Sequence, residues 1–519
     1  MNRQASRFAR ISTSQLLLFT ILCRICCLLL LGVTFKTAFA VEDEYCYWYQ
    51  ERDKSLKEMN YTIRGIRGTF FAYKEPHVAS YHKKDPLLWS MKKVEPAFEG
   101  RIGKFINLSR EPVNLLRKKN TTSTEYDPAS DIFLREIAPM SAQFFTCYLR
   151  QIFYFASPTE SKRVLKSWAI SKSRKNNVMI YDPYLVNPEQ VSSELRPKEL
   201  VNYSRFQQML EFQRQYQEFT DRTWWPNAIR EPISQPMWNA NFFGQTHSVV
   251  TKETQFVTLP SLYEYGPIFE QGRERILGED RPRLLEEYRT PYQSAMNLTL
   301  KVLSCDPRVF EIKNFLSPVE TEHILSLANV LGLGKSTMGS DSGVTDSQDA
   351  RTSHHTRVKR EQTQVIDAIY RRAADLLQID EALLRTRDES EYHPTAIGTR
   401  SIAEAAQLVH YSEGQQYAAH MDFISPNVDK PHQANRFATL LVYLNEDMKG
   451  GQTSFPRWVN SKTPDALEVT PEVGKAILFY NLLPDGNMDE MSLHSSKPVT
   501  EGEKWVMNLW IWDPLLQSN

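Results

Sequence analysis

The sequence predicts an α+β fold in which the strands of the C-terminal part close on themselves as a sandwich or a jelly roll. Two helices are expected there: one from residue 317 to about 331, which begins with a helix-start signal, and one over 361–377, where apolar residues recur at helical spacing. From residue 405 onward the segments have strand character. Helices that precede a block of strands are typical of α+β domains. The N-terminal region is expected to be largely helical or irregular.

Local signals justify the individual elements. Ser317, Pro318 and Glu320 form a capping box with proline in the first turn, which marks a helix start. Strands are expected over 300–303, 309–312, 406–411, 437–444, 475–481 and 505–512, and N-terminal helices over 141–155 and 199–219. Residues 335–349 are rich in Ser, Gly, Asp and Thr, so a flexible loop is expected, and we interpret it as a lid over substrate.

Length and charge limit the class of protein. The chain has 519 residues, enough for a targeting segment and two or three folded units. Its 62 Lys and Arg residues balance 62 Asp and Glu residues, so the field that holds nucleic acid by its phosphates is missing. Hydrophobic residues make up 41% and charged residues 24%, which are ordinary globular values. We expect a folded protein that does not bind nucleic acid.

The first forty residues have the features of a targeting segment. Three arginines precede an apolar run over 16–35, and Ala38-Phe39-Ala40 supplies the small-residue pattern of a cleavage site. This favours a cleaved signal peptide, while the length of the run leaves a type II membrane anchor as the alternative, with Arg24 counting against a stable span. The expected location is the secretory pathway, in the endoplasmic reticulum or, alternatively, the Golgi.

Cysteines and glycosylation motifs suggest two regions after residue 40. Only Cys46, Cys147 and Cys305 follow the targeting segment, so at most one internal disulfide is expected. The five Asn-x-Ser/Thr motifs begin at Asn60, Asn107, Asn120, Asn202 and Asn297. Because none follows Asn297, we expect a glycosylated region over 41–299 and a different domain over 300–519.

One group of residues has the pattern of a metal site. His420 and Asp422 are two positions apart, so on an extended backbone both side chains point to the same face. His494 is the candidate third ligand. Two His and one carboxylate leave coordination positions open, which is the arrangement of non-haem Fe(II) oxygenases. His-x-Asp alone is a weak signal, and a structural His beside a surface Asp is the alternative.

Between residues 307 and 514 the sequence contains a series of ordered blocks: Pro307-Arg-Val-Phe, Asn314-Phe-Leu-Ser, Arg351-Thr-Ser, Val409-His-Tyr-Ser through His420-Met-Asp, Arg436-Phe-Ala-Thr, Gly450-Gly-Gln-Thr, Pro484-Asp-Gly and Leu493-His494. In this order they resemble the prolyl 4-hydroxylase family of Fe(II)/2-oxoglutarate-dependent dioxygenases, and in particular its alpha-subunit-like catalytic domain. The resemblance implies a double-stranded β-helix over 300–519. The sequence departs from the family at Gln452, where Glu is usual.

The resemblance assigns roles to individual residues. It implies that His420, Asp422 and His494 bind Fe(II), and that Lys504 pairs with the distal carboxylate of 2-oxoglutarate, where one fixed cation is needed. It further implies that Tyr411 and Thr453 help to hold that carboxylate, that Tyr417 lies beside the cosubstrate, and that Arg436 and Trp510 belong to the peptide groove. The alternative is that Tyr411 and Tyr417 are buried tyrosines of the core without a role in binding.

The resemblance implies an activity like that of procollagen-proline 4-dioxygenase. Peptidyl proline is hydroxylated at C4 while 2-oxoglutarate is converted to succinate and CO2, with L-ascorbate as the reductant that restores oxidised iron. The partner is then a proline-containing peptide or protein. Hydroxylation of lysine, or of proline at C3, is the alternative within the same chemistry, and a catalytically inactive binding glycoprotein is the alternative from another class. The sequence does not indicate an oligomeric state.

Overall fold

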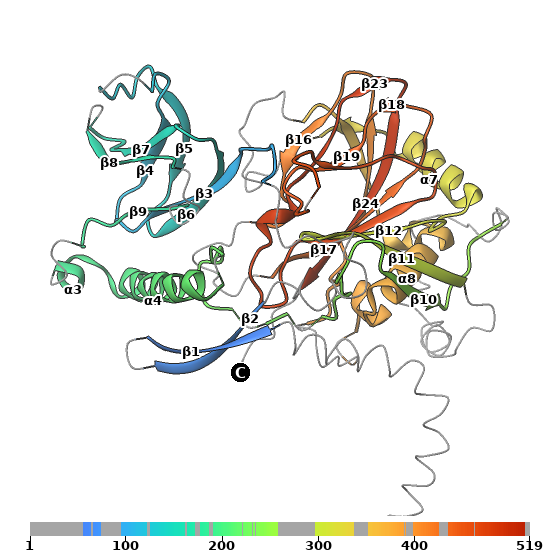
Figure 1. Ribbon diagram of the computed structural model, residues 1–519, viewed down its shortest axis with the longest axis horizontal. Coiled ribbons are helices and arrows are strands. Elements are labelled where there is room, and N and C mark those ends of the chain that lie inside the picture. Colours follow the sequence, from blue (N-terminus) through green and yellow to red (C-terminus); the bar gives the residue numbers. More distant parts are fainter. Residues whose placement is uncertain are drawn as a thin grey trace, which may run out of the picture. The chain divides into compact units, whose positions relative to one another are not determined.

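The computed structural model describes the residues in the ranges 56–63, 66–73, 95–121, 125–160, 163–171, 177–185, 190–220, 222–230, 232–233, 235–257, 296–336, 351–388, 390, 398–424, 434–460 and 462–513. All of them belong to one compact unit, residues 55–519. They are mostly β-sheet with few helices (Figure 1). The expected lid over 335–349 falls almost entirely outside these ranges.

A nine-stranded antiparallel sheet dominates the C-terminal half (Figure 1). Its strands, in spatial order, are β10 (Thr246–Thr251), β11 (Met296–Cys305), β12 (Arg308–Ile312), β21 (Ala476–Tyr480), β17 (Asn435–Tyr443), β24 (Lys504–Asp513), β15 (Ala406–Tyr411), β14 (His354–Val358) and β13 (Gly334–Lys335). The strands expected from the sequence are all present, within two residues at the ends of those after residue 405. The sheet also includes β10, which lies before residue 300.

A second, smaller sheet packs on the first. Its four antiparallel strands are β16 (Tyr417–His420), β22 (His494–Ser496), β19 (Thr453–Phe455) and β20 (Leu467–Val469), and a short ribbon pairs β18 (Lys449–Gly450) with β23 (Val499–Glu501). One hydrophobic cluster includes Val409 and Phe479 from the large sheet together with Phe455 and Val469 from the small one. The two sheets therefore share a core, and the burial of these apolar side chains holds the layers together.

The structure confirms the two helices predicted for the C-terminal part of the chain. Helix α7 (Pro318–Leu331) begins with the expected capping box, in which Ser317 and Glu320 bond reciprocally. Helix α8 (Gln364–Leu377) is capped by Thr363 and follows the 3₁₀ turn η2 (Arg360–Gln362); a further turn, η3 (Glu381–Leu384), comes after it. Between the helices, Arg372 and Glu320 form a fully buried ion pair with Nη2 and Oε1 2.7 Å apart.

The expectation of a largely helical or irregular N-terminal region is wrong for residues 101–181. These residues form a three-stranded sheet of β6 (Ser141–Cys147), β3 (Arg101–Asn107) and β9 (Val178–Tyr181), and a four-stranded sheet of β5 (Ile132–Ile137), β4 (Val113–Arg117), β7 (Ile152–Ala156) and β8 (Val164–Ala169). Phe105, Leu115 and Phe153 from both sheets meet in one core. Earlier in the chain, β1 (Leu56–Ile63) and β2 (Ile66–Tyr73) form a hairpin.

The helix expected over 141–155 is instead the pair of strands β6 and β7. Arg150 has a positive φ of 68° in the turn between them, which ends any helix. The segment is rich in Phe, Tyr and Ile, residues that favour strands, and each strand pairs with a different neighbour, β3 or β4. Tertiary pairing thus overrides the helical spacing. By contrast, the helix expected over 199–219 is present as α4 (Pro197–Thr220), preceded by the short α3 (Gln190–Glu194).

The structure bears on several expectations for the N-terminal half. Cys147 and Cys305 are both buried and free, while Cys46 lies outside the described residues. The side-chain nitrogen of Asn107 donates to the carbonyl oxygens of Glu111, Ile137 and Ala138, so this fold has no space for a glycan there. Asn120 and Asn297 are exposed. Among the described helices none has the length and apolar character needed to cross a membrane, and residues 16–35 are not among them.

We expect Arg372→Ala to destabilise the protein by about 3–5 kcal/mol, because the carboxylate of Glu320 would keep its burial but lose its ion-pair partner. Urea unfolding followed by circular dichroism measures the effect. The matched control is Arg214→Ala, whose ion pair with Glu211 is solvent-exposed and is expected to contribute less than about 1 kcal/mol. Equal changes for the two variants would contradict the prediction.

Candidate metal and cosubstrate site

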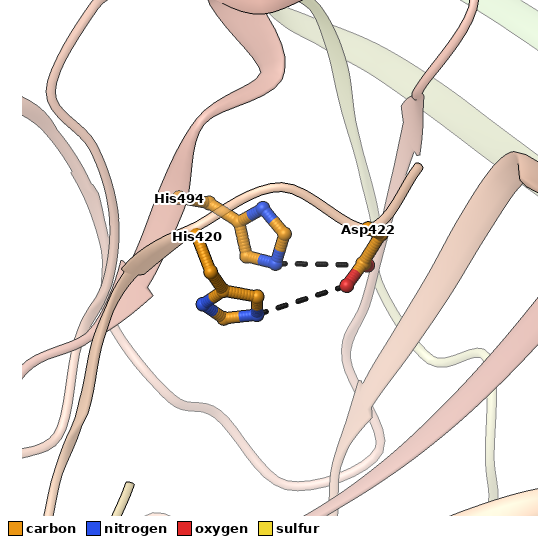
Figure 2. A group of neighbouring side chains, drawn as sticks. All are labelled: His420, Asp422 and His494. Carbon is orange, nitrogen blue, oxygen red and sulfur yellow. Dashed lines mark ion pairs between the residues drawn. The ribbon is translucent and has the colours of Figure 1, made fainter. Parts of the chain in front are cut away.

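Three side chains predicted from the sequence to bind a metal converge between the two sheets (Figure 2). His420 ends β16 and His494 begins β22, and the antiparallel register places these two residues directly opposite each other. Asp422 follows two residues after His420. Its Oδ1 lies 3.7 Å from Nε2 of His420 and its Oδ2 lies 3.6 Å from Nε2 of His494. All three are buried, and the ligand atoms lie within 4.8 Å of one another.

The imidazoles are oriented as metal ligands. Nδ1 of His420 lies 2.9 Å from the carbonyl oxygen of Ala418, and Nδ1 of His494 lies 3.0 Å from that of Ser492. A carbonyl oxygen only accepts, so both Nδ1 atoms carry a hydrogen, and both Nε2 atoms face Asp422. Such backbone partners fix the tautomer and the ring orientation of ligating histidines.

The protonation states also suit a cation. Burial, followed by the neighbouring His494, lowers the pKa of His420 to about 3, so its imidazole is neutral at physiological pH. Burial alone raises the pKa of Asp422, but the two histidines, Arg436 and the indole of Trp510 outweigh it and bring the pKa to about 2. The site thus presents the neutral imidazole of His420 and the carboxylate of Asp422, the states in which these groups bind divalent metals.

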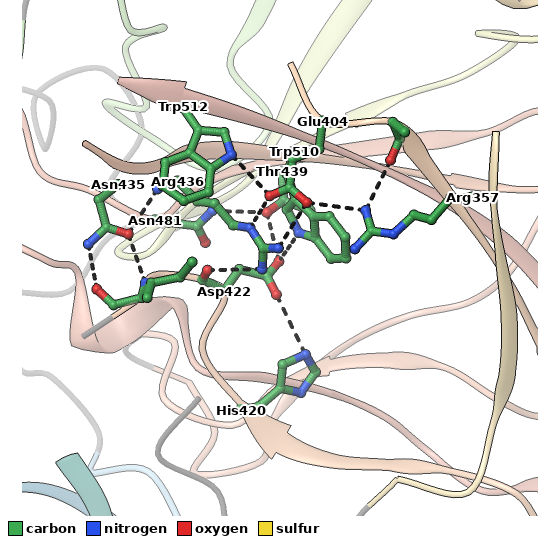
Figure 3. Close-up of polar contacts among 12 residues, drawn as sticks. Arg357, Glu404, His420, Asp422, Asn435, Arg436, Thr439, Asn481, Trp510 and Trp512 are labelled. Atoms are coloured by element: carbon green, nitrogen blue, oxygen red, sulfur yellow. Dashed lines mark hydrogen bonds and ion pairs between the residues drawn. The ribbon is translucent and has the colours of Figure 1, made fainter. Parts of the chain in front are cut away.

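A hydrogen-bond network fixes the carboxylate of Asp422 (Figure 3). Thr439 Oγ1 and Trp510 Nε1 both donate to Oδ2, at 2.7 and 2.9 Å. Thr439 accepts in turn from Nδ2 of Asn481 at 2.9 Å. These two donors fix the rotation of the carboxylate, with Oδ1 toward His420 and Oδ2 toward His494. The sequence analysis gave Thr439 and Asn481 no role in the site. Each is a polar residue in an otherwise apolar predicted strand, and this pattern could have indicated that both lie near a functional group.

These three residues line a pocket. Its lining includes every other site residue predicted from the sequence except Arg436, and the full set is Arg351, Gln407, Tyr411, Tyr417, His420, Asp422, Leu441, Thr453, His494, Ser495, Ser496, Lys504, Val506, Asn508 and Trp510. The guanidinium of Arg436 lies instead against the ring of Trp510, 4.0 Å from the ring centroid, and pairs with Glu404.

Lys504 supplies a buried cation to the pocket. Its Nζ donates to Oγ of Ser496 at 2.8 Å and lies 5.4 Å from the centroid of the Tyr411 ring. Burial lowers the pKa of Lys504 to about 7, so the charged form needs an anion beside it. Thr453 accepts from the hydroxyl of Tyr443 at 2.8 Å, which leaves its own hydroxyl hydrogen to donate.

Tyr417 connects the metal-binding residues to a second cation. Its ring stacks on His420 with centroids 3.5 Å apart, and the guanidinium of Arg351 lies 4.5 Å from the Tyr417 centroid. Arg351 lines the pocket and lies within hydrogen-bonding distance of Ser353 and Gln407. The sequence analysis used Arg351-Thr-Ser as a landmark without giving it a role. In the structure it brings a second positively charged side chain, besides Lys504, to the lining of the pocket.

Comparisons with known proteins identify the class of protein. A family model described as the 2OG-Fe(II) oxygenase superfamily matches residues 406–512, the span that includes His420, Asp422, His494 and Lys504. Probable prolyl 4-hydroxylase 3 of Arabidopsis thaliana is 32% identical over 223 residues, which cover 41% of this chain and 71% of that protein. Prolyl 4-hydroxylase 5 of the same plant is 30% identical over 223 residues, 41% of this chain and 70% of that protein.

Among solved structures, the viral collagen prolyl hydroxylase vCPH from Paramecium Bursaria Chlorella virus-1, in its 2OG complex, is 27% identical and covers 39% of this chain and 95% of its own, with a TM-score of 0.29. On the sequence relatives, the chain belongs to the prolyl 4-hydroxylase family. The residues present fit the iron and 2-oxoglutarate that this class uses, because two imidazoles and a carboxylate line a pocket with a buried lysine.

We expect Trp510→Phe to weaken binding of Mn(II), a redox-silent probe for Fe(II), by about 10-fold or more, since partners of ligating carboxylates contribute 10–100-fold to metal affinity. Isothermal titration calorimetry measures the change. The control is Trp512→Phe on the same strand, whose indole Nε1 donates to Glu404 and not to Asp422. A Trp510→Phe protein with the metal affinity of the control would contradict this role.

Affinity for 2-oxoglutarate should fall as the pH rises above about 7. Below the lowered pKa of Lys504 the ammonium is already present, whereas above it the binding of the dicarboxylate must include uptake of a proton. The apparent Kd then increases by up to about 10-fold per pH unit between pH 7 and 9. Calorimetry with Mn(II) present tests this.

The controls for the pH series are two further lysine variants. Lys504→Met should bind weakly with no such trend, while Lys497→Met, which removes an exposed lysine paired with Glu468, should keep it. A wild-type affinity that is flat or rises across this range would contradict the role given to Lys504.

Proposed function

We propose that this protein is an Fe(II)/2-oxoglutarate-dependent dioxygenase that hydroxylates peptidyl proline at C4 in proteins of the secretory pathway. The observation that carries the proposal is the arrangement of His420, Asp422 and His494 around one face of a pocket that also contains buried Lys504. Within this proposal the two antiparallel sheets with their shared core are a double-stranded β-helix. Relatives named prolyl 4-hydroxylases support proline as the target residue.

The residues of the chain have separate tasks in this reaction. His420, Asp422 and His494 hold Fe(II), and Lys504 with Tyr411 and Thr453 holds the distal carboxylate of 2-oxoglutarate. When bound, iron and 2-oxoglutarate supply the oxidation chemistry, in which O2 is consumed, one oxygen atom reaches the substrate C–H bond, and succinate and CO2 are released. The protein contributes position: the fixed ammonium sets which end of the dicarboxylate faces the metal.

The substrate end of the site is proposed at Trp510 and Arg436. Trp510 lines the pocket, and both Arg436 and Arg357 lie against its ring, with Cζ atoms 4.0 and 5.0 Å from the centroid. Glu404 pairs with both arginines and accepts from Trp512 (Figure 3). This preassembled group of aromatic and planar charged side chains suits an extended, proline-rich peptide, whose carbonyl oxygens need donors.

The reductant and the cellular location are further parts of this proposal. L-ascorbate is the proposed reductant that restores iron oxidised without product formation. The proposed location is the endoplasmic reticulum, by a signal peptide or a type II anchor over 16–35, with the Golgi as the alternative. Hydroxylation of lysine, or of proline at C3, uses the same residues at the metal and differs only in the groove.

The test is turnover by the purified full chain with Fe(II), 2-oxoglutarate, ascorbate and a library of proline-rich peptides. We expect succinate formation together with a peptide mass increase of one oxygen, and amino-acid analysis should identify 4-hydroxyproline. His420→Ala should abolish both signals because it removes a ligand. His410→Ala is the control, since His410 stacks on Trp505 and pairs with Glu503 away from the pocket.

Each outcome discriminates between the alternatives. Hydroxylysine or 3-hydroxyproline in the products would replace the C4 assignment while keeping the dioxygenase. An absence of Fe(II)-dependent succinate with every peptide, together with unmeasurable binding of Mn(II) and 2-oxoglutarate, would overturn the enzyme and favour the inactive binding glycoprotein.

A further inference from the structure

His494, the third metal-binding residue, follows directly after a loop, residues 481–493, that connects β21 to β22. This loop is internally bonded: Leu483 N donates to the carbonyl oxygen of Asn487, and Asp489 N donates to that of Asn481. It ends in the 3₁₀ turn η4 (Glu490–Ser492), immediately before His494. Ser492 bonds back to Asp489 through its hydroxyl and offers its own carbonyl to Nδ1 of His494. The position of His494 therefore depends on the position of this loop.

Residues from the end of α4 and the segment after it contact the loop through buried hydrogen bonds. Tyr216 on α4 donates from its hydroxyl to Oδ2 of Asp485 at 2.9 Å. Asn487 donates from Nδ2 to the Tyr216 hydroxyl at 3.2 Å and to the carbonyl oxygen of Thr223 at 2.9 Å, and it accepts from Trp225 N at 3.0 Å. Ile233 N donates to the carbonyl oxygen of Pro484 at 2.9 Å.

A charged contact continues this interface toward His494. The guanidinium of Arg222 lies 2.9 Å from Asp306 Oδ2 and 3.8 Å from Asp489 Oδ1. Asp489 in turn accepts from Met491 N at 3.0 Å, within the turn that precedes His494. Arg222 therefore joins the strand connection at Asp306 to the turn that leads directly to the metal-binding histidine.

These contacts are strong because water is excluded. Tyr216, Asp485 and Asn487 are each exposed by 1% or less. Burial and the charge of Asp485 raise the pKa of Tyr216 well above its usual value, so its hydroxyl stays a neutral donor. Hydrogen bonds to a buried carboxylate contribute more than neutral ones, and losing the donor leaves a desolvated charge.

We propose that Tyr216, Arg222, Thr223, Trp225 and Ile233 form a clamp that positions the loop 481–493 and thereby His494, with Tyr216 as the central positioning residue and Asn487 as its partner within the loop. The clamp residues lie outside residues 406–512, the span that the family model matches. The position of His494 therefore depends on residues that are not part of the matched oxygenase domain. The inference rests on the proposed function only in that His494 is taken to bind the metal.

The test compares two tyrosine variants of one helix in the full chain. Tyr216→Phe removes the hydroxyl that faces the loop, whereas Tyr203→Phe removes one that donates to Asp182, away from the loop, at 3.0 Å. We expect Tyr216→Phe to weaken Mn(II) binding by about 10-fold, the lower end for outer partners of metal ligands. Hydrogen–deuterium exchange should be faster over 481–493 in this variant alone. Asp485→Asn, which keeps an acceptor for the tyrosine, should retain most of the affinity.

The results separate the clamp from the proposed function. Wild-type protein that binds no Mn(II) would overturn the metal site itself. Wild-type binding with equal affinity and equal loop exchange in the Tyr216→Phe and Tyr203→Phe proteins would overturn the clamp and keep the metal site. If Tyr216→Phe weakens binding without faster exchange over 481–493, the effect does not pass through the loop and the clamp is again overturned.

Discussion

The fixed orientation of the Asp422 carboxylate is the constraint on which the geometry of the site depends. Oδ2 accepts from Thr439 and Trp510, while Oδ1 faces Nε2 of His420. A carboxylate with both oxygens unconstrained could rotate and bind a cation through either one or both. Here strands β17 and β24 each contribute one donor, so the packing of two neighbouring strands in the large sheet determines the orientation of a single ligand. The placement of this carboxylate is thus a consequence of sheet register.

The same dependence extends to the remaining ligands. His420 and His494 oppose each other because the pairing of β16 with β22 shifts register between Tyr417 and His420, and a further shift by one residue would turn one imidazole to the other face. Register in the small sheet is supported by Thr453, which pairs with Ser496 across β19 and β22. Ser496 also accepts from Lys504. The metal-binding residues and the cosubstrate lysine are therefore positioned by one set of strand pairings.

Much of the C-terminal fold and of the site could be predicted, because those signals are local or recur as ordered motifs. The capping box at Ser317 and the strand pattern over 406–411 each reflect short-range physics, and His420, Asp422, His494 and Lys504 stand in a recognisable sequence order. The strands over 141–155 could not be predicted from spacing, since their partners β3 and β4 are more than 20 residues away. Thr439, Asn481 and Tyr216 were missed for a similar reason, because only the fold shows which polar groups face the site.

Lys504 explains why metal and cosubstrate belong together in this pocket. In the protein alone, burial disfavours its charge and brings its pKa to about 7. A divalent cation beside Asp422 adds positive charge to a pocket that already contains Arg351, which disfavours the ammonium further. A dicarboxylate reverses both effects, because one end neutralises the metal and the other stabilises the charged lysine. Above about pH 7 the dicarboxylate and a proton therefore bind together, and the pocket favours an anion long enough to reach both charges at once.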